Sequence, residues 1–100
     1  MQTISRKERF MGLKKEELRK DALNLIRNAA GQNAVGASQD RFGPQASPVD
    51  EYEFSITKIM HWSGITVNDA RQALDGFEAP YMRDVLAALT RIETKQKKKP

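Results

Sequence analysis

The chain has no cysteine among its 100 residues, which excludes disulfides and thiolate metal sites. A protein without cysteine fits a reducing compartment, so we expect a cytoplasmic location, or a virion assembled there. The single histidine, His61, has no second histidine with which to share a metal ion. No apolar run approaches the roughly 20 residues that a membrane-spanning helix needs. We therefore expect neither a metal site nor a membrane-bound protein.

Side chains arranged for catalysis are also scarce. His61, Ser63 and Asp69 are the residue types of a catalytic triad, but nothing in their spacing supports triad geometry. The glycines at positions 31 and 36 form no phosphate-binding fingerprint. We therefore expect no catalytic residue, no cofactor and no small-molecule substrate. These absences favour a protein that acts by binding another macromolecule.

The apolar residues that are present follow helical spacing in two parts of the chain. In the first part, Leu18, Ala22, Leu25 and Ile26 fall on one helical face, and Gly31 suits the helix end. We expect residues 1–30 to form a basic, amphipathic helical arm, interrupted near Gly12. Residues 31–48 are rich in Gly, Ser, Asn and Gln without an apolar period, which predicts a flexible linker. This linker leaves open whether the arm packs on the rest of the chain.

The second part, residues 49–93, predicts a compact three-helix domain. Pro48 suits the start of its first helix, Ser63 and Gly64 end that helix, and Thr66 suits the start of the second. The remaining residues, 94–100, contain no apolar side chain and predict a disordered basic tail. The predicted fold class is thus all-α, with an N-terminal helix, a linker and a three-helix unit. Its expected core is Ile56, Ile59, Met60, Ile65, Ala70, Leu74, Val85, Leu86 and Leu89.

The stretch from Ile59 to Leu74 resembles the helix-turn-helix segment of bacterial repressor DNA-binding domains. Gly64 matches the turn glycine, Ile65 the apolar residue after it, and Ala70 and Ala73 the buried positions of the second helix. The resemblance covers about a fifth of the chain. One position departs from the pattern, because Met60 stands where the family usually has a small residue. The resemblance implies a reading helix over Thr66–Leu74, with Asn68, Arg71 and Gln72 as candidate base-reading residues.

Charge is distributed unevenly, with two basic ends around an acidic middle. Net charge is +4 for residues 1–30, −4 for residues 31–90 and +4 for residues 91–100. An acidic module binds DNA poorly unless basic flanks hold the phosphates. The candidate contacts to phosphates, or to an acidic protein partner, lie in the two ends. They are Lys14, Lys15, Arg19, Lys20, Lys95, Lys97, Lys98 and Lys99.

Two functional classes follow from these observations. The favoured class is a non-enzymatic interaction or assembly protein, in which an acidic helical domain and basic arms engage protein partners or other copies of the chain. In size, lack of cysteine and helical make-up it is similar to small phage-type assembly factors. Trp62 and Phe77 are core or core-edge residues by pattern, or partner-binding aromatics if they are exposed. The alternative class is a DNA-binding helix-turn-helix protein.

Overall fold

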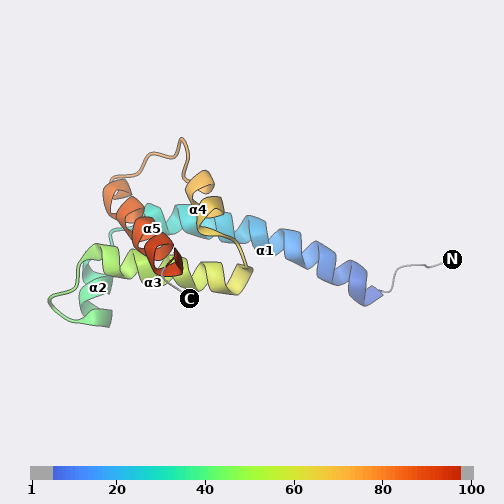
Figure 1. Cartoon of the computed structure of the whole chain (residues 1–100), viewed down its shortest axis with the longest axis horizontal. Helices are drawn as coiled ribbons and strands as arrows, with labels where there is room; N and C mark the ends of the chain where they lie inside the picture. Colours follow the sequence, from blue (N-terminus) through green and yellow to red (C-terminus); the bar gives the residue numbers. More distant parts are fainter. Residues whose placement is uncertain (1–5, 98–100) are drawn as a thin grey trace.

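The protein is all-helical over the residues that the structure, a computed structural model, describes. These are residues 6–97, with side chains described from residue 15 onward. The helices are α1 (Arg6–Ala30), α2 (Val35–Phe42), α3 (Pro48–Ser63), α4 (Val67–Ala73) and α5 (Met82–Lys97), and there is no strand in this part of the chain. The predicted all-α class is confirmed. Figure 1 shows that the N-terminal part of α1 extends beyond the packed body.

Local capping explains where α3 and α4 begin. At α3, Pro48 occupies the first turn and the Ser47 backbone N–H donates to the Asp50 carboxylate at 2.8 Å. At α4, the Thr66 N–H donates to the Asp69 carboxylate and the Asp69 N–H to the Thr66 hydroxyl, both at 3.0 Å. Gly64 lies between the two helices with a φ of 79°, a left-handed conformation that glycine adopts without steric cost.

Helix α3 is the centre of the fold, because α1, α2 and α5 all pack against it. Its buried side chains Tyr52, Ile56 and Met60 lie at four-residue spacing on one face. Helix α4 packs mainly against α1 and α5. The core also contains Ile65, Ala70, Leu74, Val85 and Leu89, as the sequence predicts.

The first helix is part of the core and does not form a separate arm. Ala22, Ile26 and Ala30 are fully buried against the rest of the molecule. The Arg27 Nε donates to the Ala73 carbonyl at 2.7 Å, which satisfies an acceptor at the end of α4. The helix runs without interruption through Gly12. The apolar face of α1 thus packs against α3 and α4 through Ala22, Ile26 and Ala30, which answers the question that the sequence left open.

The expectation of a flexible linker over residues 31–48 is wrong. Helix α2 lies within it and packs on α3, held by an ion pair of 2.9 Å between Arg41 Nε and the Glu51 carboxylate. The Ser38 side chain is fully buried and donates to the Val35 carbonyl. An eight-residue helix with few apolar side chains has little periodicity to detect, and its stability comes from tertiary contacts.

Two further expectations need correction. Helix α5 continues to Lys97, so residues 94–97 of the expected disordered tail are helical, and residues 98–100 lie outside the described part. Leu86, expected in the core, is 42% exposed, because the buried face of α5 is centred on Val85, Ala88 and Leu89. Ile59 is only partly buried. None of the helices described is long and apolar enough to cross a membrane.

Candidate functional site

The candidate reading helix, α4, exposes two of its three candidate base-reading residues. Asn68 and Gln72 are exposed and lie four residues apart, so they share one face of the helix. Arg71 instead turns toward α5, where its guanidinium lies 3.5 Å from the Glu93 carboxylate and 3.5 Å from the Thr90 hydroxyl. An Arg71 contact with a base would have to replace these contacts.

The candidate basic residues fall into described and undescribed groups. On α1, Lys15, Arg19 and Lys20 are exposed, and Arg19 forms an ion pair of 3.2 Å with Asp69 at the start of α4. On α5, Lys95 and Lys97 are exposed. The Lys14 side chain and the whole of Lys98 and Lys99 lie outside the described residues. Arg19 was expected to contact a phosphate beside α4. In the structure it pairs with the Asp69 carboxylate of α4 instead.

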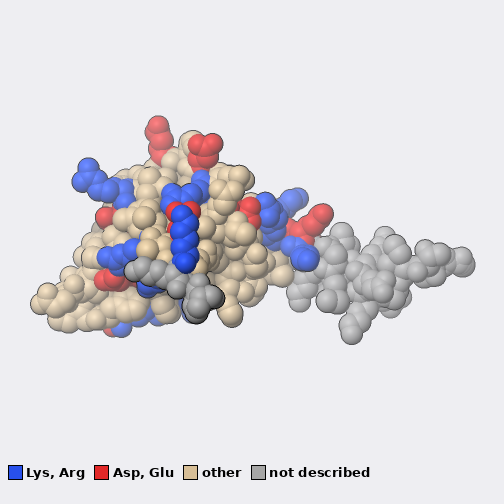
Figure 2. Space-filling model, in the orientation of Figure 1, with Lys and Arg blue, Asp and Glu red and all other residues tan. Residues whose placement is uncertain are grey.

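The acidic middle and the basic end of the sequence pair with each other inside the molecule. Arg91 lies 2.7 Å from the Asp50 carboxylate and 3.6 Å from that of Glu53, and Lys95 also forms an ion pair with Glu53. These pairs join α5 to α3 across about forty positions of sequence. On the face shown in Figure 2, Lys and Arg side chains lie among Asp and Glu side chains. The charge separation seen along the sequence is therefore reduced in the fold.

Two aspartates have lowered pKa values with clear structural causes. The Ser47 backbone N–H and then the Arg91 guanidinium lower the pKa of the Asp50 carboxyl. The Thr66 backbone N–H, helped by Arg19, lowers the pKa of the Asp69 carboxyl. Both carboxylates cap helices, so their ionised forms stabilise the starts of α3 and α4.

This arrangement predicts acid sensitivity of the fold. Because both folded pKa values lie below the ordinary aspartate value of 3.8, the carboxylates stabilise the fold above that pH. The contribution is lost as the pH falls through the lowered pKa values. We expect the urea unfolding midpoint to drop below about pH 4, and to drop less steeply in Asp69→Asn. Parallel acid profiles for the wild type and the variant would contradict this assignment.

An aromatic contact joins α2 to the outer side of α3. The rings of Phe42 and Phe54 meet edge to face, with centroids 5.7 Å apart and an interplanar angle of 76°. The Arg41 guanidinium lies over the Phe54 ring at 4.4 Å, and the Lys58 ammonium lies 5.2 Å from its centroid. Phe42 is 46% exposed although it is a large apolar side chain.

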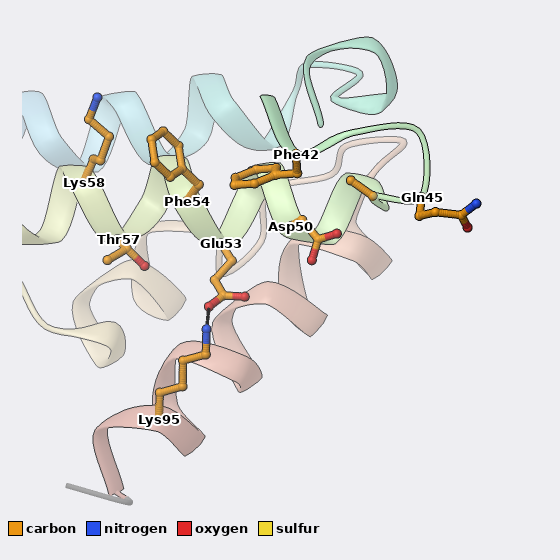
Figure 3. A pocket seen from close by; sticks show the side chains of 9 residues that line it. Phe42, Gln45, Asp50, Glu53, Phe54, Thr57, Lys58 and Lys95 are labelled. Atoms are coloured by element: carbon orange, nitrogen blue, oxygen red, sulfur yellow. Dashed lines mark hydrogen bonds and ion pairs between the residues drawn. The ribbon is translucent and has the colours of Figure 1, made fainter. Parts of the chain in front are cut away.

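Beside this contact lies an open groove of about 670 Å³ between the end of α2, α3 and the C-terminal turns of α5. Figure 3 shows Phe54 and Lys58 projecting from α3, Phe42 beside Phe54 at the end of α2, and Lys95 reaching from α5 to Glu53. A second hollow of about 390 Å³ shares Glu53, Thr57 and Lys95 with the first and continues toward His61. The carboxylates of the first groove, Asp50 and Glu53, are held by Arg91 and Lys95.

Trp62, near the C-terminal end of α3, adds a third aromatic side chain to this side of the molecule. Phe54, Lys58 and Trp62 follow one another at four-residue spacing, so they form a ridge on one face of the helix. Trp62 is 52% exposed. We call Phe42, Phe54 and Trp62 the aromatic surface. Of the aromatics predicted to bind partners, Trp62 belongs to it, whereas Phe77 is partly buried and packs against the core.

Sequence patterns alone missed most of this surface. The spacing of Phe54, Lys58 and Trp62 is visible in the sequence, but Phe54 also suits the buried face of α3. Phe42 lies in the segment expected to be a linker, so no sequence pattern placed it beside Phe54.

Within the described part of the chain, no hydrogen bond joins His61 to another side chain, and no three metal-binding side chains gather. In comparisons with protein families, curated proteins and solved structures, no match to this chain was found.

Proposed function

We propose that the protein is a non-enzymatic helical interaction protein that binds a protein partner through the aromatic surface. The observation that carries this proposal is the exposure of two large aromatic side chains, Trp62 at 52% on α3 and Phe42 at 46% at the edge of an open groove. Exposed aromatic side chains next to a groove are typical of protein-binding sites, where Trp and Tyr dominate the binding energy. Both residues stand on helices that pack together, so the surface needs little ordering on binding.

Covering this surface would supply part of the energy of a protein complex, and the rest would come from the surrounding contact area. Covering the exposed parts of Trp62 and Phe42 would remove roughly 200 Å² of apolar surface from water. That area corresponds to about 5 kcal/mol before the costs of association. Small phage-type assembly factors, to which the chain is similar in size, lack of cysteine and helical make-up, fall within this proposal. The charged arms contribute less than their sequence indicates, because Arg91 and Lys95 pair with α3 in the same molecule.

DNA binding remains the second candidate function, and one observation favours it. Asn68 and Gln72 are exposed together on α4, where their amide groups would be available to base edges. Against it, Arg71 contacts Glu93, and Asp69 places a carboxylate on the same short helix. A phosphate backbone approaching α4 would have to compete with these carboxylates for Arg71 and Arg19, which already pair with them.

The proposal is tested by comparing the proteins that co-purify with wild type and with Trp62→Ala. We expect a defined set of proteins to be retained by wild type and lost from Trp62→Ala, because truncating a central tryptophan typically removes much of the binding energy. Leu86→Ala is the matched control, since Leu86 is also exposed but lies on α5 outside the aromatic surface. It should retain the same proteins as wild type.

Two results would overturn the proposal. The first is a set of retained proteins that does not depend on Trp62. The second is a salt-dependent mobility shift of DNA that disappears in Asn68→Ala/Gln72→Ala while Trp62→Ala still shifts it, which would move the function to α4.

A further inference from the structure

The centre of the ridge on α3 carries a positive charge. Lys58 lies one helical turn from Phe54 and one from Trp62, and its side chain is exposed. Among residues whose side chains are described, no carboxylate lies within 4.0 Å of its ammonium. Lys58 is therefore available to a negative group from outside the molecule.

The acidic residues close to this ridge are already occupied. Asp50 pairs with Arg91, Glu51 with Arg41, and Glu53 with Lys95. Glu51 is buried and its carboxylate contacts Arg41, so it does not reach a ligand at the surface. A ligand with a carboxylate would thus meet Lys58 without displacing an ion pair of the fold. A cationic ligand would find the carboxylates taken.

The geometry of the ridge also limits the shape of the ligand. Eight residues of helix separate Phe54 from Trp62, which corresponds to about 12 Å along α3, with Lys58 midway. A partner helix laid along this ridge would match it with apolar side chains about two turns apart and an acidic side chain between them. The edge-on pair of Phe42 and Phe54 widens one end into an apolar shelf beside the groove.

We propose that the partner is a protein segment that carries an acidic residue between two apolar anchors. Lys58 binds the acid, while Trp62 and the Phe42–Phe54 pair receive the anchors. This inference rests on the proposed function, because it assigns a ligand chemistry to the same aromatic surface.

A single-stranded nucleic acid is the other ligand that aromatic and basic side chains together can bind. The surface is less suited to it, since nucleic-acid grooves are predominantly positive and this groove also holds Asp50 and Glu53.

The test begins with a library of random peptides displayed on phage and selected on the full chain. We expect enriched peptides to combine Leu or aromatic residues with Asp or Glu at intervals of one helical turn. A synthetic enriched peptide is then titrated while the emission of Trp62, the only tryptophan, is recorded. Binding at the aromatic surface should shift that emission to shorter wavelength, because the indole leaves water.

Charge substitutions identify the role of Lys58. We expect Lys58→Gln to weaken the peptide about threefold and Lys58→Glu about tenfold, which is one decade of Kd. Lys20→Glu, an exposed charge reversal on α1, should leave the affinity unchanged. Circular dichroism of each variant confirms that it remains folded.

The outcomes distinguish a failure of the acidic partner from a failure of the interaction surface. Enriched peptides that shift Trp62 emission but lack acidic residues, or that bind Lys58→Glu as tightly as wild type, overturn the acidic partner and leave the interaction surface standing. No enrichment, or enriched peptides that leave Trp62 emission unchanged, overturns both. A mixed-sequence single-stranded oligonucleotide that shifts the emission at low salt, in the absence of peptide binding, assigns the surface to nucleic acid.

Discussion

An Ile26→Ala variant is expected to lose about 2–5 kcal/mol of unfolding free energy. Ile26 is fully buried where α1 packs on the core, so the substitution removes apolar contacts and leaves a cavity. A domain of this size has a total stability of only about 5–15 kcal/mol, so this loss is a large fraction of it. Urea unfolding, followed by circular dichroism, measures the change.

The neighbouring residue supplies the control for this experiment. Leu25 lies on the same helix but is 42% exposed, so Leu25→Ala should cost less than about 1 kcal/mol. If both substitutions cost equally little, α1 would be a separate arm after all. The difference in unfolding free energy between Ile26→Ala and Leu25→Ala therefore tests whether α1 is docked. Both variants place Ala in the same helix, so helix propensity changes little between them.

A Glu51→Ala variant is expected to lose about 1–3 kcal/mol, the cost of leaving charged or polar partners unsatisfied. Glu51 is 7% exposed and accepts hydrogen bonds from Arg41 at 2.9 Å and from the Ser55 hydroxyl at 3.3 Å. Arg41 is about half exposed, so water can replace part of the lost pairing and the loss stays below that of a fully buried pair. Urea unfolding again gives the magnitude.

A double-mutant cycle with Arg41→Ala shows whether the ion pair holds α2 on α3. We expect a coupling energy of about 1 kcal/mol, because each single variant leaves one charge without its partner. Additivity of the two substitutions within about 0.5 kcal/mol would contradict the pairing. Glu78→Ala, at an exposed position before α5, is the control and should change stability by less than about 0.5 kcal/mol.

The ion pair matters for the candidate site because α2 carries half of the aromatic contact. Arg41 both binds Glu51 and lies over the Phe54 ring, and its neighbour Phe42 meets the same ring edge-on. Weakening the pair should therefore loosen the edge of the groove as well as the fold. Binding at the Phe42 end of the aromatic surface should therefore weaken, while Trp62, which stands on α3 itself, keeps its place.

Part of the candidate site could be predicted from the sequence and part could not. Trp62 was a candidate partner-binding residue, and it is exposed, whereas the other candidate, Phe77, is partly buried. Phe42 could not be assigned, because its segment has too few apolar residues for a periodic signal. The exposure of Leu86 could not be predicted either. The apolar stripe on α5 includes Leu86, but the stripe does not show how much of its width the neighbouring helices cover.

The sequence by itself determined the all-helical class and the points where α3 and α4 begin and end. Those points depend on residues within one turn of each other, such as Ser47 with Asp50 and Thr66 with Asp69, and on the left-handed Gly64. Only the tertiary structure decided that α1 is docked, that α2 is a helix, and which charges are neutralised. Those outcomes depend on contacts such as Arg91 with Asp50 and Arg19 with Asp69, which are 41 and 50 residues apart. Periodicity shows that a face will be buried, but the partner that buries it is set by packing.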